Sequence, residues 1–442
     1  MTEIFERLAE LEELGLYRRM RLISGPQGPR VVLDGRPVLL LCSNNYLGLA
    51  DHPRVREAAA DAAMRWGVGA GASRLVSGNM TIHRRLEERL AEFKGTEACV
   101  LFGSGYLANI GIVSTLAGPG EVIFSDELNH ASLIDGCRLS RAETFVYDHR
   151  DVEHLAWGLR HAEGRGALIV TDGVFSMDGD VAPLEDIVEL ARRYDVRIVV
   201  DEAHGTGALG PGGRGLVAET GLEDEIDVIV GTLGKALGSY GAYACCNSDV
   251  ARFLVNSARP LIFSTALPPP AVAGALAALE LLLEQPRRVE KLQGNSDALR
   301  AELAREGFGT AGSTTQIVPL IIGDAGQALA ICEAAIERGV FAQAIRPPTV
   351  PPGTSRLRLA VMASHSKGEL REAAQALGKA ALTAGFQPGT GGSIVGAQGS
   401  ARESIPSGGP RSLDEPEAGE GAPVRPFDVE APDGAPAVSR AA

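Results

Sequence analysis

Residues 197–207 read RIVVDEAHGTG and residues 227–235 read DVIVGTLGK, and these two stretches decide the fold. Each begins with a run of apolar residues and then changes to glycines and polar groups. A short, continuous apolar run bounded by turn residues is typical of a strand that is buried on both faces of a sheet. Each stretch therefore predicts a buried strand and a following loop, which carries His204 in one case and Lys235 in the other.

The same pattern recurs along most of the chain. Helical patterns at 151–163, 183–194 and 248–258 separate many of the apolar runs. The other predicted strands are ACVLF (98–102), EVIF (121–124), TFVY (144–147), ALIVTD (167–172) and GAYACC (241–246). Strand–helix alternation with continuous apolar strands predicts an α/β fold, with a mostly parallel central sheet covered by helices on both faces.

The pattern changes near residues 286 and 385. After 286, a long charged helix is followed by QIVPLII, a helix at 325–338, VFAQAI, SRLRLAV and a last helix. From residue 385 to residue 442, 11 glycines and 8 prolines occur in 58 residues, a share that signals disorder. We expect an N-terminal helix and hairpin (VVLDGRPVLLL) at 1–45 that pack beside a small C-terminal α+β domain at 286–384, a large α/β domain at 46–285, and a disordered tail at 385–442.

Composition narrows the class of protein. The 442 residues are 45% hydrophobic and carry a net charge of −14, which argues against a nucleic-acid surface and against an anionic membrane face. The N-terminus resembles no signal peptide, and no apolar run approaches the roughly 20 residues that span a bilayer. The six cysteines form no C-x-x-C pair, so we expect reduced thiols, no disulfide and no metal site. A cytoplasmic enzyme is the expectation.

Polar residues follow three of the predicted strands. The first of these strands ends at Asp172, and Ser176 lies just beyond it. The second ends at Asp201, with His204 three residues later. The third ends at Thr232, with Lys235 three residues later. In open α/β sheets, ligands bind beyond the carboxyl ends of the strands. Each residue alone also has an ordinary structural interpretation, as a turn cap, a satisfied histidine or a solvated lysine. Their recurrence at one sheet edge favours a binding site.

Lys235 allows three hypotheses: a surface lysine, a phosphate-binding loop, or a covalent anchor for a cofactor. The phosphate-binding motif G-x-x-x-x-G-K-[ST] fails here, because its first position is Ile229 and its last is Ala236. The covalent anchor fits better. Pyridoxal phosphate requires a lysine for a Schiff base and an acid for its ring nitrogen. It also needs a phosphate cradle, which GSGYLAN (103–109) offers at a helix start, and a planar stacking partner such as His130.

Seven ordered motifs carry a family resemblance. They are SNNYLGLA, GSGYLAN, DELNHASLIDG, VFSMDGD, DEAHGTGALG, GTLGKALGSYG and FSTALPP. This set, over residues 5–384, resembles the α-oxoamine synthases, a family of fold-type I pyridoxal phosphate enzymes. The resemblance implies a homodimer with shared active sites that condenses a small amino acid with an acyl thioester and releases carbon dioxide.

The C-terminal part of the pattern narrows the implied substrates. Residues 344–359, AIRPPTVPPGTSRLRL, are most similar to family members that join L-alanine to pimeloyl-CoA, or to a pimeloyl carrier protein, in biotin biosynthesis. Family members that use glycine to make 2-amino-3-oxobutyrate, or that make 5-aminolevulinate or sphingoid bases, are the alternatives. A non-catalytic partner subunit would lack the anchor lysine, which is present as Lys235.

The resemblance also implies a role for individual residues. Lys235 would anchor the cofactor and shuttle the Cα proton, Asp201 would pair with the ring nitrogen, His204 would bind the phenolic oxygen, and His130 would stack on the ring and face the substrate. The further cofactor residues would be Gly105, Tyr106, Ser176 and Thr232, with Ser264 and Thr265 reaching the phosphate of the neighbouring subunit. The substrate residues would be Asn45 and Arg358 at the amino-acid carboxylate, and Thr349 with Arg18 or Arg19 at the acyl group.

Overall fold

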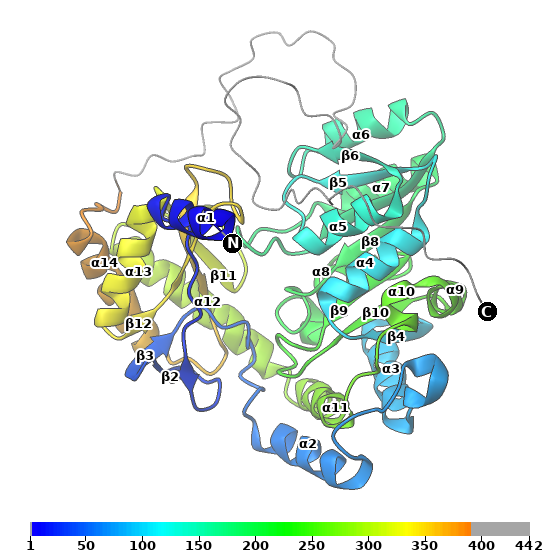
Figure 1. The fold of residues 1–442 in the computed structure, drawn as a ribbon, viewed down its shortest axis with the longest axis horizontal. Helices are drawn as coiled ribbons and strands as arrows, with labels where there is room; N and C mark the ends of the chain where they lie inside the picture. The colour runs from blue at the N-terminus through cyan, green and yellow to red at the C-terminus, as the bar shows by residue number, and fades with distance from the viewer. Residues whose placement is uncertain (1, 390–442) are drawn as a thin grey trace. The chain divides into compact units, whose positions relative to one another are not determined.

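The structure is a computed structural model that describes residues 2–389. In this part of the chain, the central sheet has seven strands (Figure 1). In spatial order they are β4 (Ala98–Phe102), β10 (Ala242–Cys246), β9 (Val228–Thr232), β8 (Arg197–Asp201), β7 (Gly166–Asp172), β5 (Val122–Asp126) and β6 (Glu143–Tyr147). Neighbouring strands run parallel except at β10, which is antiparallel to both β4 and β9. The predicted mostly parallel sheet is confirmed.

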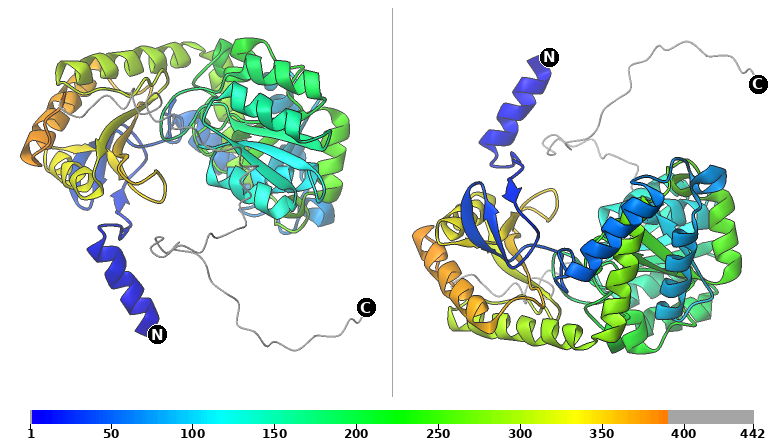
Figure 2. Two further views of the ribbon diagram at one scale, coloured as in Figure 1. Left: turned by 90° about the horizontal axis from the view of Figure 1, so that it is seen from above. Right: turned by 90° about the horizontal axis from the view of Figure 1, so that it is seen from below.

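Both faces of this sheet are buried. Along β8, Val199 belongs to one hydrophobic core while Ile198 and Val200 belong to the other, since successive side chains of a strand point to opposite faces. One face is covered by α4 (Gly105–Leu116), α5 (Ala131–Ser140), α9 (Ser248–Ser257) and α10 (Arg259–Ile262). The other is covered by α2 (Pro53–Trp66), α3 (Thr81–Lys94), α6 (Val152–His161), α7 (Leu184–Tyr194), α8 (Leu216–Thr220) and α11 (Pro269–Glu284) (Figures 1 and 2). This double cover explains why the strands are continuously apolar.

The C-terminal elements form a smaller α+β layer. Its antiparallel sheet has the order β11 (Ile317–Gly323), β14 (Ser355–Ala360) and β13 (Gln343–Ile345). The helices beside it are α12 (Arg287–Arg305), α13 (Ala325–Glu337) and α14 (Lys367–Thr383). A second sheet joins β1 (Ile23–Ser24), β2 (Arg30–Leu33) and β3 (Arg36–Leu40) to β12 (Val340–Phe341). The hairpin therefore packs beside the C-terminal elements, as expected.

Two details differ from the expectations. The single predicted strand 340–345 is divided, because β12 pairs with β3 while β13 pairs with β14 in the other sheet. Helix α1 (Thr2–Glu13) was expected to pack, yet Ile4 and Phe5 are 63% and 67% exposed. Arg346 ties the chain just after α1, through the carbonyls of Gly15 and Tyr17.

The remaining expectations concern the C-terminal tail and membrane-spanning segments. Phe386, at the start of the predicted tail, stacks on Phe308 with ring centroids 6.5 Å apart. Residues 390–442 lie outside the described residues, so the tail and the domain boundaries stay predictions.

Within residues 2–389, none of the helices combines the length and the apolar character that a membrane span requires. Two short helical turns, at Arg74–Gly78 (η1) and Pro211–Gly213 (η2), complete the elements.

Candidate active site

The structure brings together the polar residues at the ends of three neighbouring strands. Asp172 on β7 and Asp201 on β8 are direct partners in the parallel register. The next strand, β9, ends at Thr232, and the chain then forms a tight loop that carries Lys235 and returns as β10. Gly238 in this loop has a φ of +59°, and a Cβ there would lie 2.4 Å from the nitrogen of Ala50. The positive φ and the close approach of the Ala50 backbone together require glycine here.

A continuous chain of hydrogen bonds starts at Lys235. Its Nζ lies 2.7 Å from Nε2 of His204, and Nδ1 of His204 lies 2.6 Å from the hydroxyl of Tyr46. Tyr46, which is fully buried, donates its hydrogen to Oδ1 of Asn44 over 3.0 Å, and Arg358 donates to the same oxygen over 3.2 Å. Because Tyr46 donates to Asn44, it accepts from Nδ1 of His204, which leaves Nε2 as the acceptor that faces Lys235.

Burial governs the protonation of this cluster. It lowers the pKa of Lys235 to about 8, with the positive charge of Arg358 adding to the effect and the carboxylate of Asp201 opposing it. Burial, with Lys235 and Arg358 nearby, holds the pKa of His204 well below its usual value, so this imidazole is neutral. Burial and the neighbouring Asp201 raise the pKa of Asp172 well above its usual value.

Asp201 is held at the end of its strand by two donors. Its Oδ1 accepts from the backbone N–H of Ala203 over 2.8 Å, and its Oδ2 accepts from Nδ2 of Asn109 over 2.6 Å. Asn109 also donates to Ser132, and its own Oδ1 is buried without a hydrogen-bond partner among the described residues. These contacts fix the orientation of the Asp201 carboxylate, and Oδ1 of Asn109 remains an acceptor without a donor beside it.

The start of α4 offers unpaired backbone donors. Ser104 caps this helix by accepting from the N–H of Leu107. The N–H groups of Gly105 and Tyr106 have no hydrogen-bond partner among residues 2–389, and a Cβ on Gly105 would meet nothing within 4 Å. A helix N-terminus with free N–H groups and open space in front of it suits a phosphate.

His130, Ser176 and Thr232 lie at the same sheet edge. The His130 side chain is exposed, and its Nδ1 accepts from the N–H of Ser132 at the start of α5. Its backbone N–H donates to Asp172 over 3.0 Å. The hydroxyl of Thr232 accepts from the N–H of Gly234 in the Lys235 loop. The exposed imidazole of His130 and the carboxyl groups of Asp172 and its strand partner Asp201 lie at this edge, and together they fit a flat, charged ring. The residues present therefore fit pyridoxal phosphate.

Arg358 lies next to this cluster with unused hydrogen-bonding capacity. It is 7% exposed, and it donates to the carbonyl of Ser176 and to Asn44. Its Nη2 is buried and has no partner among the described residues. Asn45, in contrast, uses its side chain elsewhere, donating to the carbonyl of Gln27 and accepting from the N–H of Ala50. Beside Arg358 the structure thus places Asn44 and not Asn45.

The predicted acyl residues lie in a separate cavity of about 690 Å³. Arg18, Arg19 and Thr349 all line it, together with Arg21 and Arg346. Arg18 donates to the carbonyl of Pro347, in the segment that carries Thr349, whereas the guanidinium of Arg19 lies over the ring of Tyr17. Neither Lys235 nor Asp201 lines this cavity.

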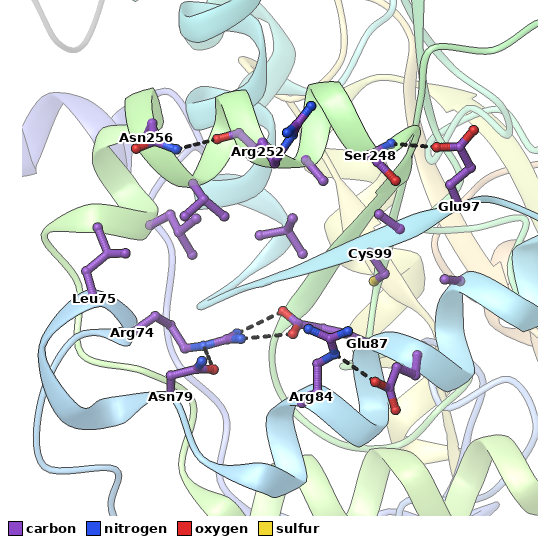
Figure 3. A pocket seen from close by; sticks show the side chains of 17 residues that line it. Arg74, Leu75, Asn79, Arg84, Glu87, Glu97, Cys99, Ser248, Arg252 and Asn256 are labelled. Atoms are coloured by element: carbon purple, nitrogen blue, oxygen red, sulfur yellow. Dashed lines mark hydrogen bonds and ion pairs between the residues drawn. The ribbon is translucent and has the colours of Figure 1, made fainter.

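Ser264 and Thr265 line a small cavity with Gly103, and Thr265 forms a bridge with Ser73, which precedes η1. A neighbouring cavity of about 470 Å³ is drawn in Figure 3, where Arg74 of η1 points toward Glu87 of α3. Both bonds of that pair measure 2.9 Å. None of the predicted site residues lines the larger cavity.

Three residues of the cluster had no role in the sequence-based prediction: Asn44, Tyr46 and Asn109. All three lie in the quoted motifs SNNYLGLA and GSGYLAN. A polar side chain inside a motif that is otherwise small and apolar was the available signal. The motif alone could not distinguish Asn44 from Asn45, because the two are adjacent and chemically identical.

Comparisons with known proteins identify the family of the chain. The family model described as "Aminotransferase class I and II" matches residues 36–377. The 8-amino-7-oxononanoate synthase of Citrifermentans bemidjiense is 55% identical over 377 residues, which cover 85% of this chain and 97% of that protein. The synthase of Symbiobacterium thermophilum is 47% identical and covers 85% and 96%.

Solved structures give the same result. The serine palmitoyltransferase of Sphingomonas wittichii has a TM-score of 0.82 and 34% identity, covering 87% of this chain and 97% of that one. An 8-amino-7-oxononanoate synthase from Francisella tularensis has a TM-score of 0.68 and 26% identity, covering 78% and 98%. The chain therefore belongs to the α-oxoamine synthases among the pyridoxal phosphate enzymes of fold-type I, in the branch of the 8-amino-7-oxononanoate synthases.

Proposed function

We propose that this chain joins L-alanine to a pimeloyl thioester with loss of carbon dioxide, giving 8-amino-7-oxononanoate for biotin biosynthesis in the cytoplasm. Arg358 is the observation that carries the proposal on this chain. A buried guanidinium N–H without a partner costs about 1–3 kcal/mol, which a ligand acceptor would recover. A carboxylate is the acceptor that best matches a guanidinium in charge and shape. Nη2 of Arg358 is therefore suited to bind the carboxylate of the amino acid.

The cofactor would be held by groups on several strand ends. The N–H groups of Gly105 and Tyr106 would bind its phosphate, and the exposed ring of His130 would lie against its ring. Asp201 would keep the ring nitrogen protonated, because an opposite charge within about 4–6 Å favours the charged form. When bound, pyridoxal phosphate supplies an electron sink that makes the Cα proton of the amino acid acidic.

Lys235 would move that proton. A general base works best when its pKa lies near the working pH, and burial brings the pKa of Lys235 to about 8. Neutral His204 accepts a hydrogen bond from Nζ, which holds the amine in one direction. The chain from His204 through Tyr46 to Asn44 fixes the His204 tautomer, so Nε2 stays an acceptor toward Lys235.

The two substrates would meet different parts of the chain. Arg358 would bind the amino-acid carboxylate, and the geometry favours Asn44 over Asn45 as its companion. The arginine-lined cavity with Thr349 would receive the acyl substrate, with Arg18 favoured over Arg19 through its contact with Pro347. Four arginines line that cavity against two glutamates, Glu12 and Glu333, and this excess of positive charge suits an anionic acyl carrier such as coenzyme A.

A homodimer with shared sites is part of the proposal. Ser264 and Thr265 would reach the phosphate of the neighbouring subunit. Several large apolar side chains on nearby segments are exposed, among them Met64 (89%), Val68 (79%), Val76 (79%) and Phe263 (71%). Exposed apolar side chains of this kind support a surface that another chain covers.

The proposal is tested by assaying the purified protein with alanine, glycine and serine against acyl-CoA thioesters of different lengths. We expect alanine with pimeloyl-CoA to give the highest kcat/KM. One methyl group is worth only about 1–3 kcal/mol, so glycine should be used roughly 10- to 200-fold less well and not be inert. Release of carbon dioxide and formation of the amino ketone are the readouts. A clear preference for glycine would move the chain to the 2-amino-3-oxobutyrate branch.

A further inference from the structure

His149 lies between two carboxylates that the proposed mechanism does not use. It follows β6, and its Nδ1 lies 2.9 Å from Oδ1 of Asp126 while its Nε2 lies 2.9 Å from Oδ2 of Asp180. The imidazole side chain is 16% exposed, and its ring meets the ring of Phe175 edge-on at 4.4 Å. Both nitrogens of one ring therefore face an acceptor.

This geometry requires a protonated ring. A carboxylate only accepts hydrogen bonds, and a neutral imidazole has a single N–H, so two carboxylates can be satisfied only by an imidazolium. Burial would lower the pKa of His149, but the hydrogen bonds to Asp126 and Asp180 outweigh it and raise the pKa to about 9. Three other groups face the carboxylates of Asp126 and Asp180. Arg150 has its Nη1 3.2 Å from Asp180, and its backbone N–H donates to Asp126. The charge of Asp126 also adds to the burial that raises the pKa of Asp172 and of Tyr147.

The first of the two carboxylates shapes the loop that presents His130. Asp126 ends β5, and its Oδ1 also accepts from the N–H of Leu128 over 2.9 Å. The loop then continues through Asn129 to His130, which precedes α5. A shift of the Asp126 carboxylate would therefore move the loop that carries the imidazole of His130.

The second carboxylate belongs to the turn that presents Ser176. The backbone carbonyl of Asp180 accepts from the N–H of Phe175 over 3.0 Å, so Asp180 closes the turn around Ser176. On its far side the same turn is held by Arg356, which binds Asp178 at 2.5 Å, and by Arg358, which binds the carbonyl of Ser176. His149 thus connects this turn to the loop of His130.

We propose that the His149 imidazolium is a positioning residue that locks the His130 loop to the Ser176 turn, and so sets the geometry of the cofactor site. The proposal rests on the cofactor site described above and is independent of which amino acid or acyl group is used. His149 acts through the two segments and touches neither cofactor nor substrate.

The test is the affinity of the apoprotein for pyridoxal phosphate, measured by fluorescence titration without other substrates between pH 7 and 10. In His149→Gln, the side chain has donors on one nitrogen only, and its other polar atom is an oxygen that accepts, so it cannot donate to both carboxylates as the two ring nitrogens do. Because this variant loses a hydrogen bond to a charged group, we expect it to bind pyridoxal phosphate at least about tenfold more weakly than the wild type at pH 7.5. The exposed His161, changed to Gln, is the matched control and should bind like the wild type.

Asp180→Asn separates positioning from a general loss of stability. An amide can present its oxygen to an imidazolium or its NH2 to a neutral imidazole, so the link survives deprotonation of His149. We expect wild-type affinity at pH 7.5 and a smaller loss of affinity than in the wild type as the pH rises through about 9. Comparison with the wild type at each pH removes the contribution of Lys235, which both proteins share.

Each outcome decides the proposal. If folded His149→Gln binds the cofactor as tightly as the wild type, the proposal is overturned. Identical alkaline profiles for the wild type and Asp180→Asn would overturn it as well, even if His149→Gln fails to fold. A wild-type protein that binds no pyridoxal phosphate would overturn both this proposal and the proposed function, whereas binding without turnover of alanine would overturn the latter alone.

Discussion

Lys235 shows how one side chain acquires reactivity from its surroundings. Burial is the largest influence and lowers its pKa to about 8, while Asp201 and Asp172 favour the ammonium and Arg358 disfavours it. A lysine in water has a pKa near 10.5 and is almost fully protonated at neutral pH, so it is a poor nucleophile. The buried amine is unprotonated in a far larger fraction of molecules.

This shift has a measurable consequence for cofactor capture. Because the free amine is the nucleophile, the rate at which apoprotein bonds covalently to pyridoxal phosphate should rise through about pH 8. Asp201→Asn removes a charge that favours the ammonium, so its midpoint should move to lower pH. Stopped-flow absorbance at the cofactor band measures both rates. A wild-type midpoint near the ordinary lysine value of 10.5, or an upward shift in Asp201→Asn, would contradict this account.

At the scale of elements, the loop after β8 depends on one buried ion pair. Lys94 of α3 and Glu202 are 1% and 0% exposed, with Nζ and Oε2 3.3 Å apart. Lys94 also donates to the carbonyl of Arg214, and Glu202 accepts from the N–H of Val217. Gly215 has a φ of +104°, and a Cβ there would lie 1.4 Å from Oε2 of Glu202. The pair therefore fixes the segment that follows Asp201 and His204.

Breaking this pair should destabilise the whole fold. Lys94→Met leaves an unpaired buried carboxylate, which costs about 3–5 kcal/mol in the free energy of unfolding. Adding Glu202→Gln removes that charge but keeps an acceptor for Val217, so the double variant should recover part of the loss. Urea unfolding followed by circular dichroism measures both. The control is Arg84→Met, which breaks an exposed pair with Glu88 and should change stability far less. Equal losses of stability in Lys94→Met and Arg84→Met would refute this ranking.

The same scale shows what sequence could and could not predict. Strands buried on both faces, such as β8 and β9, have an unbroken apolar signal, so the central sheet was predictable. The division of 340–345 between two sheets was not predictable. Residues 340–341 pair with β3, which lies some 300 positions earlier in the chain, and residues 343–345 pair with β14, which lies beyond a loop. Likewise, sequence placed Lys235, Asp201 and His204 at one edge. Which of two adjacent asparagines turns toward Arg358 depends on the path of a loop.

At the scale of the whole molecule, the site described in one chain lacks two of its proposed phosphate contacts. The strand-end residues around Lys235 come from a single subunit, but Ser264 and Thr265 would act on the neighbouring one. Within one chain, Thr265 instead bridges to Ser73 beside η1, and the side chain of Thr265 is exposed. In a shared-site dimer, each site thus combines Lys235 of one subunit with residues 264–265 of its partner.

Such an arrangement predicts complementation between two inactive variants. Subunits with Lys235→Ala lack the anchor, and subunits with Ser264→Ala and Thr265→Ala lack the contacts they lend to the partner. In a mixed dimer, one site receives both defects and the other receives neither. A 1:1 mixture that exchanges subunits freely contains half mixed dimers, so roughly a quarter of the wild-type sites should be restored. Activity and cofactor absorbance after co-expression measure this fraction. The two variants purified separately, and mixed without subunit exchange, are the control. If tandem-tagged mixed dimers are isolated and remain inactive, residues 264–265 serve their own subunit and the shared-site arrangement is wrong.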